Sequence, residues 1–173
     1  LALVGYTNAG KSTLMNLITG ANVITENKLF STLDTTVRKV TLSPSREFLI
    51  SDTVGFIKKL PHHLIVSFLT TLSEAVESDI LLHVIDISDP LIDENIKVVN
   101  ETLKELNCDK KSIIMVFNKI DLLKDRELLA YYKNKYKNSV FISAIRSINI
   151  NLFIDQIFTL LNLHLKEYTL FLK

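Results

Sequence analysis

The sequence of 173 residues has few of the residues that cross-link or interrupt a fold: 1 cysteine, 3 prolines, 4 glycines and no tryptophan. The single cysteine, Cys108, cannot form an internal disulfide, and no Cys/His cluster has the spacing of a zinc site. This favours a reducing compartment, so we expect a cytoplasmic protein. No apolar run is as long as a membrane span. Because no Pro/Gly-rich linker divides the chain, we expect one domain over residues 1–173.

The sequence also lacks an excess of charge of one sign. Lys and Arg number 20 and Asp and Glu 19, so the net charge is +1, which argues against a domain that binds nucleic acid by bulk charge alone. Hydrophobic residues make up 47% of the chain, which is enough for a packed core. The chain opens directly on an apolar strand pattern. We therefore expect a domain cut from a longer protein, and we expect it to be a monomer.

Residues 5–12 form a glycine-rich pattern, G-x-x-x-x-G-K-S, between an apolar run at 1–4 and a helical pattern at 13–19. Strand, glycine loop and helix in this order are the context in which backbone N–H groups bind phosphate oxygens. Lys11 is expected to reach the β- and γ-phosphates, and Ser12 to place its hydroxyl on Mg²⁺. The alternative is a chance Gly/Lys turn. The predicted contacts are Gly5, Tyr6, Thr7, Asn8, Ala9, Gly10, Lys11, Ser12 and Thr13.

Apolar strands and amphipathic helices alternate along the rest of the chain. The pattern predicts an antiparallel hairpin at 37–42 and 47–51 and further strands at 80–86, 112–117 and 139–142. It predicts helices at 64–76, 92–106, 128–136 and 149–163. Such alternation is typical of an α/β fold whose mostly parallel sheet is covered by helices on both faces. Ligands then bind outside the carboxyl ends of the strands.

Asp52 follows the second strand of the hairpin and opens a D-x-x-G pattern at 52–55. Asp52 can hold Mg²⁺ through a water molecule, and the N–H of Gly55 can meet the γ-phosphate. The alternative is an ordinary Asp-Gly turn. The position directly after a strand favours a phosphate and metal site.

The strand at 112–117 runs into an N-K-x-D pattern at 118–121. Guanine presents its N1–H and its exocyclic amine side by side, and the carboxylate of Asp121 can accept both, whereas adenine would leave that carboxylate unpaired. Asn118 can bond the base and connect to the phosphate loop, and the stem of Lys119 can lie along the ring. After the last strand, the backbone N–H of Ala144 would meet guanine O6.

Together these residues resemble the translation-factor-related P-loop GTPases, and more narrowly the G domain of the HflX family. The narrower likeness rests on residues 5–13, 30–34, 52–57, 59–64 and 82–84, which read GYTNAGKST, FSTLD, DTVGFI, KLPHHL and LHV. The resemblance covers nearly the whole chain and implies a three-layer α/β/α P-loop NTPase fold with a six-stranded sheet. It also implies GTP hydrolysis with Mg²⁺ and association with the large ribosomal subunit through flanking domains and switch regions.

The irregular segment at 22–36 is expected to supply a threonine that completes the Mg²⁺ shell and senses the γ-phosphate. Thr32, Thr35 and Thr36 are the candidates, and the resemblance favours Thr32, which joins Lys11 and Gly55 as the expected catalytic set. The sequence departs from the family pattern at Val37, where threonine is usual, and after Ser-Ala, where Lys or Arg is frequent. By the resemblance, the remaining nucleotide contacts are Phe30, Ser31, Leu33, Asp34, Thr53, Val54, Ser143 and Ile145.

Two residues bear on the rate of hydrolysis. Asn8 resembles the asparagine of GTPases that bind K⁺ where others use an arginine finger; alternatively, Asn8 only stabilises the loop. Phe56 follows D-x-x-G, where Ras-like enzymes carry a glutamine that orients the attacking water. Phenylalanine has no hydrogen-bonding group, so we expect slow intrinsic hydrolysis, and we expect residues 56–63 to form a surface that orders against a partner.

Three other functions are compatible with parts of the sequence. A P-loop nucleotide kinase would have no N-K-x-D pattern, a nucleotide-binding module would bind GTP without cleaving it, and another ribosome-assembly GTPase is the third alternative. Among the remaining residues, His83 lies inside an apolar strand and is expected to be a core histidine. Tyr131 and Tyr132, next to a lysine series, are expected on a helix surface, and Cys108 in a loop.

Overall fold

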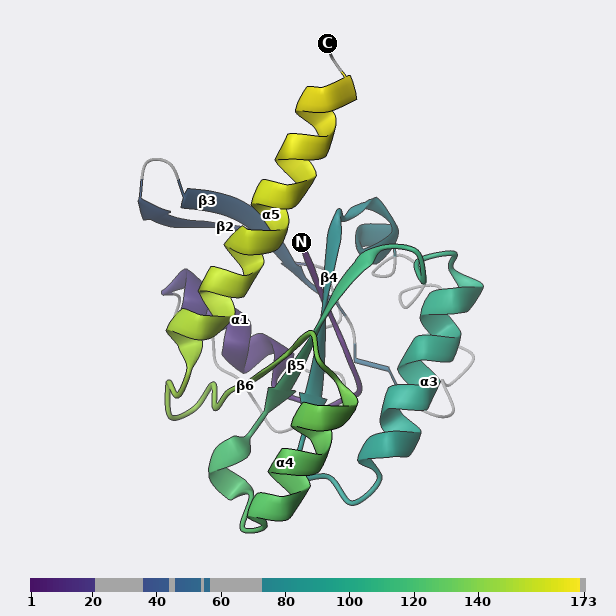
Figure 1. Cartoon of the computed structure of the whole chain (residues 1–173), viewed down its shortest axis with the longest axis vertical. Coiled ribbons are helices and arrows are strands. Elements are labelled where there is room, and N and C mark those ends of the chain that lie inside the picture. The colour runs from purple at the N-terminus through teal and green to yellow at the C-terminus, as the bar shows by residue number, and fades with distance from the viewer. Residues whose placement is uncertain (21–35, 44–45, 54, 57–72, 172–173) are drawn as a thin grey trace.

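The chain folds around one sheet of six strands (Figure 1). The computed structural model describes residues 1–20, 36–43, 46–53, 55–56 and 73–171, without the side chains of residues 126 and 163–171. Neighbouring strands are parallel except in the β2–β3 hairpin, which confirms the expected mostly parallel sheet with one antiparallel pair. In spatial order the strands are β2 (Thr36–Ser43), β3 (Arg46–Asp52), β1 (Ala2–Val4), β4 (Ile80–Asp86), β5 (Ser112–Asn118) and β6 (Ser139–Phe141).

Helices cover both faces of the sheet and give the molecule three layers (Figure 1). α1 (Lys11–Thr19) and α5 (Ile150–Phe171) pack on one face, where their apolar side chains join those of the sheet in one cluster. α3 (Ile92–Glu105) and α4 (Arg126–Lys135) pack on the other face in two further clusters. Both faces are therefore shielded from water, as the continuous apolar run of β4 requires.

Several helix bounds differ from the sequence expectation, and two of the differences have a clear physical reason. α4 begins at Arg126 because the Asp125 side chain accepts hydrogen bonds from the N–H groups of Glu127 and Leu128 and so caps the helix. α5 continues to Phe171, well beyond the expected end at 163, and no glycine or proline occurs in that part of the sequence to stop it. The helix expected at 64–76 lies largely outside the described residues.

One residue expected on a helix surface, Tyr132, lies in the core instead. Tyr132 is 2% exposed, because its side of α4 packs on the sheet, where the ring centroid of Phe117 lies 5.4 Å away. Leu128 and Tyr136 lie one helical turn to either side in the same cluster, so α4 has an apolar face that the neighbouring lysines obscured in the sequence. Cys108 lies in the loop after α3, as expected, and is fully buried there.

Phe56 is also a core residue, which corrects the expectation of a partner surface at this position. Its side chain is 1% exposed and lies in the apolar cluster between β1 and α3. Its backbone pairs with the loop after β1: Phe56 N–H donates to the Gly5 carbonyl oxygen and Thr7 N–H donates to the Phe56 carbonyl oxygen, each over 3.0 Å. These two backbone hydrogen bonds fix Phe56 with its ring directed into the core. Residues 57–63 lie outside the described residues, so the partner surface stays a prediction for them alone.

Replacing Phe56 with alanine is expected to destabilise the fold by about 3–5 kcal/mol, because the buried ring leaves a cavity that its neighbours fill only partly. Urea unfolding followed by circular dichroism measures this change in the free energy of unfolding. Leu49→Ala is the matched control: Leu49 is 58% exposed on β3, and its loss is expected to change that free energy by less than about 1 kcal/mol. Similar losses in the two variants would place Phe56 outside the core.

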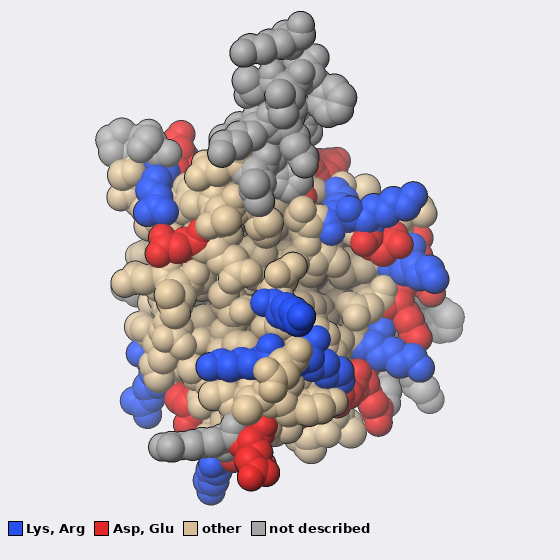
Figure 2. Space-filling view, in the orientation of Figure 1, with Lys and Arg blue, Asp and Glu red and all other residues tan. Residues whose placement is uncertain are grey.

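Charged side chains of both signs are interspersed over the face of the molecule seen in Figure 2, with a small group of Lys and Arg around α4. This distribution agrees with the net charge of +1. Because the charges on this face are mixed, electrostatic attraction from an excess of one charge contributes little to the binding of a partner there. Within the described ranges, no helix is both long enough and apolar enough to cross a membrane.

Candidate nucleotide-binding site

The polar motifs of the sequence meet at one edge of the sheet. Asp52 is the last residue of β3, Asp86 of β4 and Asn118 of β5, and the glycine loop follows β1. These four strands are parallel to one another, so their last residues lie at the same edge, and segment 143–144 follows β6 there. This carboxyl edge is where α/β sheets bind ligands.

The loop between β1 and α1 wraps around the ammonium group of Lys11. Lys11 is buried, and its Nζ donates to the backbone carbonyl oxygens of Gly5 and Tyr6 over 3.1 and 3.2 Å. Gly10 turns the chain into α1 in a left-handed conformation with a φ of 95°, and a Cβ there would overlap the Asn118 amide. The N–H groups at the start of α1 therefore face a closed loop, an arrangement that binds phosphate groups.

Burial lowers the pKa of Lys11 to about 8, and the nearby Asp52 carboxylate opposes that shift only in part. An ammonium group in such a place is stabilised by any anion that shares the site. A phosphate group beside Lys11 would form charge-assisted hydrogen bonds with it and restore its charged form. The loop therefore suits an anionic ligand.

A hydroxyl and a carboxylate lie side by side at the start of α1. Ser12 Oγ donates to Asp52 Oδ2 over 2.6 Å, and Asp52 is only 4% exposed. Mg²⁺ prefers oxygen ligands and is commonly held by one or two protein groups together with substrate phosphates and water. The Ser12–Asp52 pair fits such an ion. In the part of the chain that the structure describes, no cluster of three or more His, Cys, Asp or Glu side chains could hold a metal by itself.

Gly55 lies against the phosphate loop where a side chain has no room. A Cβ at this position would lie 2.8 Å from the Cα of Thr7 and 3.0 Å from Lys11 Nζ. The backbone of Gly55 thus comes close to the Lys11 ammonium group, as a γ-phosphate contact requires. Thr53 is placed differently: it is buried and donates its Oγ1 to the carbonyl oxygen of Leu3 over 2.6 Å, so its side chain joins β1 to the end of β3.

The N-K-x-D segment is tied to the phosphate loop. Asn118 Nδ2 donates to the carbonyl oxygen of Ala9, and Asn118 Oδ1 accepts from the N–H of Ala144, each over 2.9 Å. The expected connection between Asn118 and the loop is therefore present, while the Ala144 N–H, expected to meet guanine O6, donates to Asn118. Asp121 lies in the short 3-10 helix η2 (Ile120–Leu122) and is exposed, so its carboxylate is accessible to a base.

Asp86 was not among the site residues expected from the sequence. Lys119 Nζ lies 2.6 Å from Asp86 Oδ2, and both side chains are less than a third exposed. The strand register pairs Asp86 directly with Asn118. A carboxylate at the end of an apolar strand was the available signal, but only the register of β4 against β5 brings it to Lys119.

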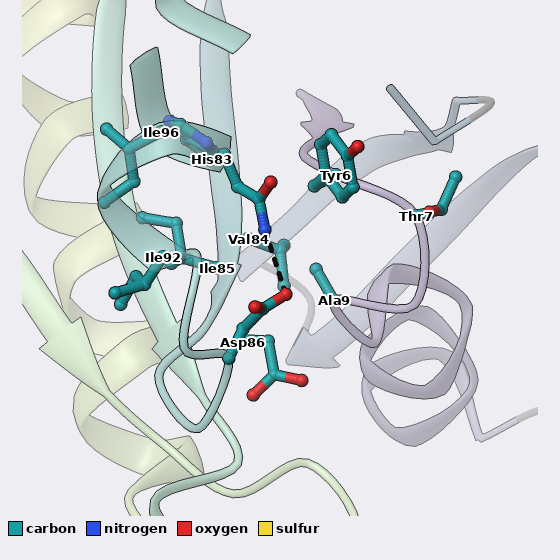
Figure 3. A pocket seen from close by; sticks show the side chains of 11 residues that line it. Tyr6, Thr7, Ala9, His83, Val84, Ile85, Asp86, Ile92 and Ile96 are labelled. Carbon is teal, nitrogen blue, oxygen red and sulfur yellow. Dashed lines mark hydrogen bonds between the residues drawn. The ribbon is translucent and has the colours of Figure 1, made fainter. Parts of the chain in front are cut away.

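A small pocket lies directly behind the phosphate loop (Figure 3). Tyr6, Thr7 and Ala9 line it from the loop, and His83 of β4 and the first turns of α3 line it from the other side. His83 is 1% exposed, which confirms the expected core histidine, and its Nδ1 has no hydrogen-bond partner among the described residues. Burial lowers the pKa of His83 to about 3, and the charge of Lys11 adds to the shift, so His83 is neutral near pH 7.

The depressed pKa of His83 predicts a stability that decreases as the pH decreases. The unfolded chain protonates His83 near its ordinary pKa of 6.5, but the folded chain does so only near pH 3. Between these values the unfolded state binds more protons, so each pH unit below 6.5 removes up to about 1.4 kcal/mol from the free energy of unfolding. Urea unfolding of the unsubstituted chain and of His83→Gln from pH 7 to 5 isolates this group, because the other titrating groups are shared. Parallel stability curves would contradict the prediction.

For several expected site residues, the structure gives no observation that bears on nucleotide or metal binding. Residues 30–35 and 54 lie outside the described residues. Thr36 is exposed at the start of β2, Ile145 is 74% exposed, and Asn8 is exposed with a φ of 59°. Their parts in nucleotide or metal binding stay predictions.

Residues 1–119 match the protein family described as 50S ribosome-binding GTPase. GTPase HflX of Caldanaerobacter subterraneus subsp. tengcongensis is 48% identical over 157 residues, which cover 91% of this chain and 35% of that protein. GTPase HflX of Flavobacterium psychrophilum is 44% identical over 97% of this chain and 46% of that protein. The chain therefore spans between a third and a half of the length of these curated relatives.

Solved structures share the architecture. A GTP-binding protein from Sulfolobus solfataricus in complex with GDP has a TM-score of 0.72 and 30% identity, over 92% of this chain and 51% of that one. Era in complex with MgGDPNP and nucleotides 1506–1542 of 16S ribosomal RNA has a TM-score of 0.72 and 26% identity, over 90% of this chain and 54% of that one. These likenesses confirm the expected P-loop GTPase fold. With the match over residues 1–119 and the similarity to HflX proteins, they show that this chain belongs to the HflX branch of the 50S ribosome-binding GTPase family.

Proposed function

We propose that this chain is the GTP-binding and GTP-hydrolysing domain of a Mg²⁺-dependent nucleotide switch that acts on the large ribosomal subunit in the cytoplasm. The observation that carries the proposal is the hydrogen-bonded link from the base-reading segment to the phosphate loop through Asn118, beside the buried Lys11 and the Ser12–Asp52 pair. One connected structure can thus bind a guanine base at one end and its phosphates at the other.

Each residue has a separate task in this proposal. Lys11 and the N–H groups at the start of α1 bind phosphate oxygens and offset their charge, which is the main contribution of the protein in phosphoryl transfer. Ser12 and Asp52, with Thr32, would hold Mg²⁺, and the ion would supply positive charge to offset that of the phosphates. Asp121 would accept the two donors of the guanine edge.

The ribosomal part of the proposal is supported by the family and by relatives more than twice as long as this chain. Era, a structural relative, is bound both to MgGDPNP and to a segment of 16S ribosomal RNA. The charges of this chain are balanced, so bulk attraction to RNA contributes little. The flanking domains and the segments next to the γ-phosphate would therefore carry the contact.

Binding of fluorescent GDP and GTP, together with phosphate release, tests the proposal. We expect both nucleotides to bind in the presence of Mg²⁺, EDTA to weaken GTP binding, and ATP to compete poorly. Hydrolysis should be slow, because Phe56 offers no group that could orient water, and large ribosomal subunits should stimulate it in the complete protein. Binding without hydrolysis, even with ribosomal subunits, would leave only a nucleotide-binding module. Hydrolysis that ignores ribosomal subunits would remove the proposed partner.

K⁺ is expected to accelerate GTP hydrolysis relative to Na⁺ by about tenfold or more, since a monovalent cation beside the phosphates would offset the negative charge that develops during the reaction. Asn8, an exposed residue of the phosphate loop, would hold such an ion. Phosphate release in KCl and in NaCl at equal ionic strength measures the effect, and Asn8→Ala should abolish the difference. Equal rates in the two salts would exclude K⁺ from the reaction.

A further inference from the structure

A carboxylate outside the four sequence motifs holds the lysine of the N-K-x-D segment. Asp86 is the last residue of β4, and the parallel register pairs it with Asn118, the residue before Lys119. Lys119 Nζ lies 2.6 Å from Asp86 Oδ2, and the two side chains are 29% and 19% exposed. Partial burial of this kind makes the ion pair stronger than one on an open surface.

The Asp86 carboxylate is itself fixed in place. Its second oxygen, Oδ1, accepts the backbone N–H of Ser88 over 2.9 Å and the hydroxyl of Ser88 over 2.6 Å. An aspartate that accepts the N–H two residues further on closes a local turn and cannot rotate freely. One oxygen of Asp86 therefore anchors the carboxylate, and the other faces Lys119.

The backbone of Lys119 is fixed as well. Lys119 adopts a left-handed conformation, with φ 66° and ψ 32°, where the chain turns from β5 into η2. Non-glycine residues rarely adopt this conformation, so the surrounding structure must hold it. The N–H of Ile87 contributes by donating to the Asn118 carbonyl oxygen over 3.0 Å. Both ends of the Lys119 side chain are thus held by β4 and the residues that follow it.

We propose that Asp86 is a positioning residue of the guanine site, which acts through Lys119 by keeping its stem in the conformation that lies along the face of the base. This inference rests on the proposed function, in which 118–121 bind guanine. A lysine side chain has many rotamers, and ordering it on binding lowers affinity. Because Asp86 orders it on folding, guanine nucleotides bind to a stem that is already in place.

Asp86→Asn tests this role with little disturbance of the turn. The asparagine oxygen can still accept both bonds from Ser88, but its NH₂ group then faces the Lys119 ammonium, donor against donor. We expect a loss of about tenfold in affinity for GDP and GTP alike, in a variant that still unfolds in one cooperative transition and is therefore folded. An effect of net charge alone would change the affinity in the opposite direction, because removing a carboxylate near an anionic ligand should tighten binding. Asp109→Asn, at the other end of β5, is the matched charge control and should lose no affinity.

A double-mutant cycle with Lys119→Met shows whether Asp86 acts through Lys119. Methionine keeps an unbranched stem of similar length without the ammonium group, so Asp86 has nothing to hold. We expect Lys119→Met to weaken GDP binding about as much as Asp86→Asn does, and the double variant to be no weaker than either. Two outcomes would overturn the proposal. In the first, Asp86→Asn binds GDP as tightly as the unsubstituted chain. In the second, Asp86→Asn lowers GDP affinity by the same factor whether residue 119 is lysine or methionine.

Ser88→Ala provides a second measurement that keeps the carboxylate. It removes one of the two bonds that anchor Asp86, so a smaller loss of about threefold in GDP affinity is expected, again absent in the Lys119→Met background. If both variants fold and bind GDP with unchanged affinity, Asp86 only stabilises the local turn, and the proposal is wrong. If the unsubstituted chain binds no guanine nucleotide, the proposed function fails instead, so the two failures are distinguishable.

Discussion

Replacing Lys11 with alanine is expected to lower the affinity for GTP, or the rate of its hydrolysis, by about a hundredfold or more. The Lys11 ammonium lies inside the loop, where the carbonyl oxygens of Gly5 and Tyr6 accept its hydrogen bonds and burial lowers its pKa to about 8, so an anion beside it would be bound strongly. Alanine removes the one buried positive charge in the described part of the loop, which is proposed to bind a phosphate group. Equilibrium binding of fluorescent GTP and single-turnover phosphate release measure the two losses.

Lys133→Ala is the matched control for this experiment. Lys133 is exposed on α4, where its Nζ lies 5.6 Å from the centroid of the Phe141 ring, and it belongs to none of the motifs that meet at the carboxyl edge. Its removal takes away the same charge and the same stem, so the net charge of the two variants is equal. We expect a change of less than about twofold in GTP affinity, as for most surface charges. Equal losses in both variants would mean that Lys11 acts through net charge and not as a phosphate ligand.

Asp121→Asn is expected to reverse the choice of base. The carboxylate of Asp121 is proposed to accept the N1–H and the exocyclic amine of guanine, and an asparagine amide presents a donor to that amine. A site built for a hydrogen bond rejects a mismatched partner strongly, so GTP affinity should decrease by about a thousandfold or more. Xanthine carries a carbonyl where guanine carries the amine, so xanthosine triphosphate should bind the variant better than GTP. Competition between the two nucleotides measures the preference directly.

Asp125→Asn controls for the loss of one negative charge in the same region. Asp125 caps α4 through the N–H groups of Glu127 and Leu128, and asparagine caps a helix as well as aspartate. GTP should remain preferred over xanthosine triphosphate in this variant. A GTP affinity that survives unchanged in Asp121→Asn would show that Asp121 does not read the base.

The sequence by itself determined the local parts of this protein. A phosphate loop, a D-x-x-G turn and an N-K-x-D segment are each contiguous, because the backbone of a few neighbouring residues makes the contacts that matter. Helical and strand spacing likewise predicted the alternating elements and the β2–β3 hairpin, since periodicity reports which residues face a core. For the same reason His83, in the middle of an apolar strand, was expected in the core and lies there.

The tertiary structure alone decided which distant groups meet. Asp86 reaches Lys119 because β4 and β5 pair in one particular register, and a shift of one residue would turn its side chain to the other face of the sheet. The tertiary structure also determines which aromatic rings are buried. Phe56 packs into the apolar space between β1 and α3, and Tyr132 packs against the sheet face under α4. A sequence shows that a residue is apolar or charged. Its burial, its pKa and its partners depend on elements that are remote in the chain and adjacent only in the fold.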